Sequence, residues 1–436
     1  MASNIPNSAA KFQANNQANN QANNGDSYHF AFAAMTTLFF IWGFITALND
    51  ILIPHLKAAF DLNYLQAMLV QFCFFGAYFI MSPLAGKLIS KIGYLKGIIT
   101  GLLTIAAGCC LFYPAAEIGV YWVFLAGLFV LASGITILQV SANPYVASLG
   151  AEKTAASRLN LAQAINSLGH TLGPIFGTVL IFGAVAHTDV IDAKSVQLPY
   201  LLLAGATIII AIGFKFLHLP TIASIAETPD NSATETGTIW QQKPLLLGAL
   251  AIFLYVGAEV SIGSFLVNYF TQNDIAGLTE KKAGEMVSYY WGAAMIGRFV
   301  GAYLTRIVKP SYVLASNAVF VMILLATTMT SSGHIAMWSV IAVGFFNSIM
   351  FPTIFTLAIR GLGPLTSKGS GLLCQAIVGG AILPLIQGYV ADISSVQASF
   401  IVPAFAYVYI CAYGLYSAKS TIKESNENKA IVEGNL

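Results

Sequence analysis

The sequence predicts an all-α integral membrane protein in which twelve transmembrane helices form two pseudo-symmetric six-helix halves. Of the 436 residues, 57% are hydrophobic and only 9% are charged, whereas a soluble protein carries about 25% charged residues. The apolar stretches are long enough to cross a bilayer as helices, and they lack the short alternating pattern of membrane β-strands. A polar segment near the middle of the chain separates six of these stretches from the other six.

A hydropathy window of about 19 residues locates the individual spans. They begin near His29, Tyr64, Gly93, Val120, Leu159 and Leu198 in the first half, and near Pro244, Gly284, Tyr312, Ile335, Gly369 and Phe400 in the second. We therefore expect a cytoplasmic tail at 1–28, a first half at 29–219, a central loop at 220–242, a second half at 243–418 and a tail at 419–436. The first tail contains three Gln-Ala-Asn-Asn repeats, a low-complexity composition typical of disorder.

The distribution of Lys and Arg predicts the orientation of the spans. With a cytoplasmic N-terminus, the outer loops contain four of these residues, Lys57, Lys194, Lys281 and Lys282. The inner loops and the C-terminal tail contain fourteen: Lys87, Lys91, Lys96, Lys153, Arg158, Lys215, Lys243, Arg306, Lys309, Arg360, Lys368, Lys419, Lys423 and Lys429. Positive residues accumulate in cytoplasmic loops, so we expect both termini in the cytoplasm.

Several classes of function are not supported. A formal net charge of +2 gives no reason to expect a nucleic-acid partner. The five cysteines lack metal-ligand spacing, and the chain has neither a phosphate-binding glycine loop nor a nucleophile–histidine arrangement. We therefore expect no enzyme activity and no cofactor. Without an ATP site, any work that the protein performs must be driven by an ion gradient or by the gradient of a solute.

Asp50 lies well inside the first apolar stretch. Because a carboxylate within a membrane span is energetically costly, it marks a functional site by default. Trp42, Thr46, Asn49 and Asp50 are spaced i, i+4, i+7 and i+8, so they share one face of a helix. An indole, a hydroxyl, an amide and an acid on one face predict the wall of a polar cavity, half of a small-solute site coupled to a cation.

Carboxamides recur in the other spans that we assign to this cavity. They are Gln139 and Asn143 in the fourth span, Gln163 and Asn166 in the fifth, Asn347 in the tenth and Gln375 in the eleventh. Each offers both donors and acceptors, which suits the hydroxyl groups of a sugar. Alternatively, these amides hold helices together, at about 0.6 kcal/mol per bond.

Glu259, in the seventh span, is the second acid within the membrane, and Tyr255 lies one turn before it. We assign both to the cavity, although Glu259 could instead make a gate or packing contact to the other half. Arg298 is interpreted as part of a network that anchors a helix end and a loop. His170, on the face of the fifth span that carries Gln163 and Asn166, is interpreted as a helix-packing histidine.

The two halves repeat each other. Gly86–Lys91 matches Gly301–Arg306, Asn143-Pro144 matches Phe351-Pro352, Gln163-Ala164-Ile165 matches Gln375-Ala376-Ile377, and Pro174 matches Pro384. A repeat with the same topology in both halves is the parallel duplication of the major facilitator fold.

Three motifs give a more specific resemblance. The chain resembles the fucose–galactose–glucose:cation symporters of the major facilitator superfamily in Leu48–Pro54, Ser141–Val146 and Arg158–Gly169, and also in Phe351–Phe355. The resemblance implies a bacterial inner-membrane symporter that works by alternating access. It also implies that Asp50 couples the cation, that Trp42 is a cavity aromatic, and that Gln163 and Asn166 bind sugar.

Two departures from the fucose permease of that family favour its glucose/galactose subgroup. Gln139 stands where the permease has a second coupling glutamate, and Glu259 stands where it has an amide. Because an amide cannot carry a proton but keeps an oxygen ligand, we expect sodium, a hard cation, with Asp50 as a ligand and Gln139 and Glu259 as further coupling residues.

We therefore expect a monomeric symporter that imports a hexose such as glucose or galactose, with the sugar and the lipid bilayer as its partners. Proton-coupled uptake of fucose or an amino sugar remains an alternative, as does an exporter of drugs or polar solutes with the same fold.

Overall fold

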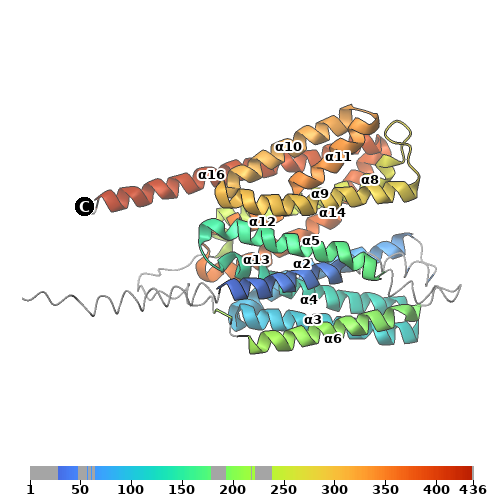
Figure 1. Cartoon of the computed structure of the whole chain (residues 1–436), viewed down its shortest axis with the longest axis horizontal. Helices are drawn as coiled ribbons and strands as arrows, with labels where there is room; N and C mark the ends of the chain where they lie inside the picture. The colour runs from blue at the N-terminus through green and yellow to red at the C-terminus, as the bar shows by residue number, and fades with distance from the viewer. Residues whose placement is uncertain are drawn as a thin grey trace, which may run out of the picture.

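Helices are the only regular secondary structure among the described residues. The computed structural model (Figure 1) describes residues 28–47, 56, 60, 64–177, 193–217, 219–220 and 238–434. The helices of the first half are Tyr28–Ala47, α2 (Tyr64–Ile92), α3 (Tyr94–Ile118), α4 (Tyr121–Ser148), α5 (Ala155–Gly177) and α6 (Gln197–Phe216).

The second half repeats this order with two interrupted spans. Its helices are α8 (Lys243–Phe270), α9 (Glu280–Ile307), α10 (Pro310–Thr330), α11 (Gly333–Asn347) with α12 (Met350–Ile359), α13 (Thr366–Gln375) with α14 (Gly379–Ile393), and α16 (Ile401–Gly434). Each predicted span therefore falls on a helix or on a pair of consecutive helices. The last helix, α16, continues past the ends of its neighbours (Figure 1).

Ten of these spans are apolar enough over a bilayer-length window to be identified from composition alone. Of the other two, α5 carries a row of amides and hydroxyls, and α9 begins with charged residues and has Arg298 in its interior. These two helices pack against each other across the boundary between the halves. Their polar surfaces therefore face protein in part, and hydropathy is lowest where the halves meet.

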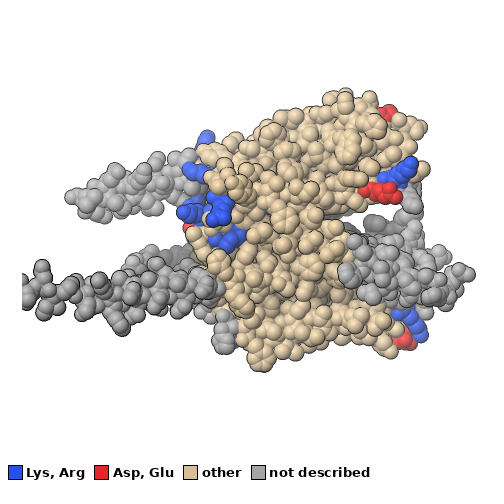
Figure 2. Space-filling model, viewed as in Figure 1, with Lys and Arg blue, Asp and Glu red and all other residues tan. Residues whose placement is uncertain are grey.

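The halves lie side by side (Figure 1) and are in contact near the end of the bundle from which the C-terminus projects. Here the Ser157 hydroxyl donates to the Ala302 carbonyl at 2.6 Å, and Glu152 pairs with Arg360 at 2.5 Å. Gly371 allows α13 to approach α2, because a Cβ there would lie 2.7 Å from the Ser82 carbonyl oxygen. At the opposite end, Figure 2 shows a gap between the halves.

A proline in α4 contributes to the contact between the halves at the end that carries the C-terminus. Because Pro144 has no N–H, the Val140 carbonyl four residues earlier loses its helical donor. The Ser370 hydroxyl of α13, in the other half, donates to that carbonyl at 2.9 Å. The proline thus frees an acceptor within a helix, and the second half supplies the donor.

Candidate functional site

A cavity of about 230 Å³ lies between the two halves. The first half lines it with Trp42, Thr46, Phe74, Tyr78, Gln139, Gln163, Asn166 and His170, and the second half with Val256, Glu259, Arg298, Phe351, Pro352 and Ile377. The structure thus brings together six residues that the sequence assigned to a solute site: Trp42, Thr46, Gln139, Gln163, Asn166 and Glu259. We refer to this space as the central cavity.

The amide wall of the central cavity is built by the first helix, α4 and α5. The Asn166 Nδ2 donates to the Phe39 carbonyl at 2.8 Å, which ties α5 to the first helix. Gly43 makes this approach feasible, since a Cβ there would lie within 3 Å of Asn166 backbone and side-chain atoms. Gln139 is buried, and its Oε1 has no hydrogen-bond partner among the described residues. An unpaired buried acceptor costs free energy, so Gln139 is suited to accept a bond from a solute hydroxyl.

Trp42 supplies the aromatic surface of the same wall. Its ring packs edge-on against Phe39 with centroids 5.2 Å apart, and the side chain is 7% exposed. The Thr46 hydroxyl, one turn further, donates to the Trp42 carbonyl at 2.9 Å. An indole held in one orientation beside amides offers an apolar face to the C–H face of a ring-shaped polar solute.

The opposite wall carries a charged pair. An Arg298 guanidinium nitrogen lies 4.0 Å from Glu259 Oε1, and both side chains are about 15% exposed. Arg298 also donates from Nε to the Ser348 carbonyl at 3.3 Å and from Nη1 to the Ser167 hydroxyl of the first half. The Ser348 carbonyl is available because Pro352, four residues later, has no N–H to donate.

These contacts correct the interpretation of Arg298 as a helix-end anchor. Arg298 lies in the central cavity, its acidic neighbour Glu259 belongs to the same half, and only its bond to Ser167 crosses to the other half. The sequence did contain a signal for this role. Arg298 lies far from both ends of α9, and a charged side chain at such a position needs a partner within the membrane. His170, interpreted as a packing residue, also lines the cavity.

Four other predicted residues do not line the central cavity: Asn143, Tyr255, Asn347 and Gln375. Asn143 and Asn347 are fully buried, and neither amide atom of Asn143 has a partner among the described residues. Asn347 donates to the Tyr290 hydroxyl at 3.0 Å and accepts at its backbone carbonyl from Tyr255 at 3.1 Å. The Gln375 amide donates to the Phe79 carbonyl of the other half at 3.3 Å. Three of these four side chains therefore have partners in the helix packing.

Asn49 and Asp50 lie outside the described residues. Their proposed roles therefore rest on the sequence pattern of the first span alone. No cluster of metal-ligating His, Cys, Asp or Glu side chains occurs within the part of the chain that the structure covers.

Comparisons with known proteins agree with this architecture. The sequence model of one protein family, the Major Facilitator Superfamily, matches residues 30–376 of this chain. The chain is 54% identical over 421 residues to a glucose/galactose transporter of Brucella abortus biovar 1 (strain 9-941), which covers 96% of this chain and 100% of that protein. It is 34% identical to an L-fucose-proton symporter of Escherichia coli (strain K12), over 90% of this chain and 94% of that protein. A crystal structure of FucP, a Major Facilitator Superfamily transporter in the outward conformation, matches with a TM-score of 0.81 and 33% identity, over 90% of this chain and 99% of that one.

Proposed function

Because this chain belongs to the Major Facilitator Superfamily of membrane transporters, we propose that it takes up a hexose such as glucose or galactose by cation-coupled symport. The observation that carries the proposal is the central cavity, in which the amides of α4 and α5 and the Trp42 indole form one wall and a charged pair lies on the opposite wall. Hydroxyl groups both donate and accept, and this lining offers both functions. The name of the 54% identical Brucella protein supports glucose and galactose as the substrates.

Trp42, Gln139, Gln163, Asn166 and Glu259 are the proposed sugar contacts. Asn49 is retained as a further contact because it shares the face of Trp42 in the sequence pattern. Tyr255, Asn347 and Gln375 are proposed to act through the packing that holds these contacts in place. Asn143 is buried outside the central cavity. Arg298 joins the site as the partner of Glu259.

Transport by alternating access is supported by the arrangement of the halves. The halves touch at the end that carries the C-terminus and part at the other (Figure 2). Figure 2 shows Lys and Arg residues gathered at the closed end, whereas acidic and basic residues occur side by side at the other end. The positive-inside rule then assigns the closed end to the cytoplasm. We propose a monomer in the bacterial inner membrane, in an outward-facing state, with both termini cytoplasmic and its halves joined through residues 220–242.

The proposed coupling ion is sodium, with Asp50 as a ligand and Gln139 and Glu259 as coupling residues. Sodium needs hard oxygen ligands, which a carboxylate and an amide provide, whereas Gln139 cannot carry a proton. The 34% identity to an L-fucose-proton symporter supports the alternative, in which Asp50 or Glu259 carries one proton.

Uptake of labelled hexoses into right-side-out vesicles tests both parts of the proposal. We expect glucose or galactose to accumulate when an inward sodium gradient is imposed at constant pH. In sodium-free buffer with an inward proton gradient, we expect no accumulation. Robust accumulation in that second condition would show that protons, and not sodium, are the coupling ion. Absence of hexose uptake in both conditions would reject the proposed substrate.

A further inference from the structure

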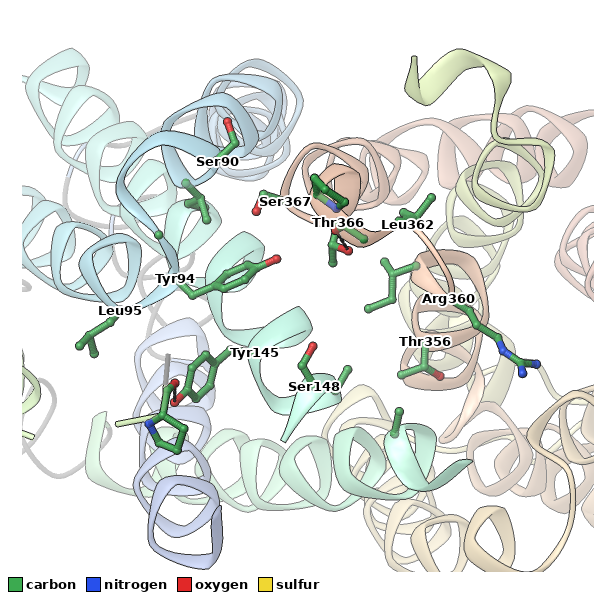
Figure 3. Close-up of a pocket in the computed structure, with 18 of the residues that line it drawn as sticks. Ser90, Tyr94, Leu95, Tyr145, Ser148, Thr356, Arg360, Leu362, Thr366 and Ser367 are labelled. Carbon is green, nitrogen blue, oxygen red and sulfur yellow. Dashed lines mark hydrogen bonds between the residues drawn. The ribbon is translucent and has the colours of Figure 1, made fainter. Parts of the chain in front are cut away.

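A second cavity, larger than the central one, lies at the closed end of the molecule (Figure 3). Its volume is about 740 Å³, compared with about 230 Å³ for the central cavity. One wall comes from the first half, at the ends of α2 and α4 and the start of α3. The other comes from the second half, at the end of α12 and the start of α13. With the proposed orientation, this cavity faces the cytoplasm, and we refer to it as the inner cavity.

Hydroxyl groups dominate the polar lining of the inner cavity. They belong to Ser90, Tyr94, Tyr145, Ser148, Thr356, Thr366 and Ser367. Five of them, those of Ser90, Tyr145, Ser148, Thr356 and Thr366, donate their protons to backbone carbonyls at 2.7–3.0 Å. A hydroxyl that has used its proton can only accept further bonds. The lining therefore matches a ligand with several O–H donors. Its charged side chains are Lys96, Glu152 and Arg360, and the last two pair with each other at 2.5 Å.

Two tyrosines add aromatic surface that reaches toward the other half. The Tyr94 and Tyr145 rings have centroids 6.5 Å apart. Figure 3 shows the Tyr94 hydroxyl pointing across the cavity toward Ser367 at the start of α13. Hydroxyl acceptors beside aromatic faces are the chemistry that recognises the O–H groups and C–H faces of a saccharide.

We propose that the inner cavity is a second saccharide-binding site through which cytoplasmic sugar slows uptake. The proposal rests on the proposed function, since it assumes a sugar transporter in the outward-facing state. A ligand in this cavity contacts both halves, so it binds while the Glu152–Arg360 and α2–α13 contacts are closed. A ligand that prefers one state shifts the population toward that state. Internal saccharide would then hold the closed end together and delay its opening.

Maltose is the probe that separates the two cavities, because a disaccharide has one more ring than a hexose and the inner cavity is the larger space. Proteoliposomes of uniform orientation are loaded with maltose, and the initial rate of external hexose uptake is measured. With internal maltose at about ten times its dissociation constant, the site is mostly occupied, and we expect uptake to slow about tenfold. External maltose should leave the rate unchanged, and internal glycine betaine, which has no O–H donor, controls for osmolarity.

A Ser148→Ala/Thr366→Val double variant removes two acceptors of the inner cavity. We expect it to lose the inhibition, with each protein compared to its own rate without maltose. Thr330→Val is the matched control, because Thr330 makes the same type of bond to its own helix but lies exposed at the outer end of α10. Equal inhibition of the double variant and the control would overturn the proposal.

Calorimetric titration of the purified protein with maltose keeps this test independent of transport. We expect binding to the wild-type protein and to Thr330→Val, and its loss in the double variant. Absence of binding to the wild-type protein would overturn the proposal even if hexose uptake is normal. Absence of hexose uptake with maltose binding intact would instead reject the proposed function.

Discussion

Arg298 contacts both halves of the protein from a single position in the central cavity. It donates to Ser167 in the first half and to the Ser348 carbonyl in the second, and it faces Glu259 at 4.0 Å. When the halves separate at this level, the Ser167 bond must break while the contacts within the second half persist. Arg298 is therefore a residue whose bonding changes with the state of the transporter.

Removing one charge of the Arg298–Glu259 pair should destabilise the protein more than removing both charges. Arg298→Gln leaves the Glu259 carboxylate without its counter-charge, and breaking a buried ion pair costs about 3–5 kcal/mol. The 15–16% exposure of the two side chains favours the lower end of that range. We expect Arg298→Gln to lower the melting temperature of the purified protein, and Glu259→Gln/Arg298→Gln to recover part of the loss. A double variant that melts no higher than Arg298→Gln would show that the charges do not stabilise each other.

Two buried amides provide a matched comparison of binding with packing. Gln163 lines the central cavity, whereas Asn143 is buried away from it. A lost hydrogen bond costs about 0.5–1.5 kcal/mol, and more where the partner stays unsatisfied. We expect Gln163→Ala to weaken hexose binding about tenfold in calorimetric titrations, and Asn143→Ala to leave the affinity unchanged. The same affinity in Gln163→Ala as in the wild type would assign Gln163 to helix packing instead.

At the scale of helices, prolines in equivalent positions of α4 and α12 free carbonyl groups that then bind other parts of the protein. Pro144 frees the Val140 carbonyl for Ser370 of the other half. Pro352 frees the Ser348 carbonyl for Arg298 of the same half. The same backbone feature thus contributes to the inner contact in one repeat and to the central cavity in the other.

Ser370→Ala should weaken the inner contact, because the Val140 carbonyl then lacks both a helical and a side-chain donor. We expect the variant to populate the inward-open state more than the wild type does. Spin labels at Lys91→Cys and Lys368→Cys, on a background without native cysteines, would report this as a longer average distance between α2 and α13. Ser316→Ala, in which the lost hydroxyl bonds only its own helix at an exposed position, is the control. Unchanged distance distributions in Ser370→Ala would exclude a role for this bond in closure.

At the scale of the whole molecule, coupling requires that ion and sugar bind in one transport cycle. Asp50 is the proposed ion ligand, and an acid within a membrane span has a functional cause. We expect Asp50→Asn to abolish accumulation against a gradient while retaining exchange of labelled for unlabelled hexose. Both are measured in the same vesicle preparation. Full gradient-driven accumulation by Asp50→Asn would remove Asp50 from the coupling mechanism.

The membrane class, the helical spans and the repeat of the two halves could be predicted from the amino-acid sequence. The physical reason is local: each span must satisfy its own backbone hydrogen bonds in lipid, so it must be a long apolar helix wherever it lies in the fold. The helices α5 and α9 are more polar than the other spans, because their polar surfaces face protein in part where the halves meet.

Which polar side chains meet could not be predicted, because those contacts depend on how the helices pack. Gln139 and Asn143 are one turn apart on α4, yet only Gln139 lines the central cavity. In α4, 78% of the most apolar window is buried, and a helix enclosed on nearly all sides has no polar stripe that reveals which face is open. The contacts of Arg298 could not be predicted either, because they also depend on packing. Ser167 lies on a helix that only the packing of the two halves brings to Arg298, and Glu259 lies on a helix that packing within the second half brings to it. No spacing along the chain encodes these contacts.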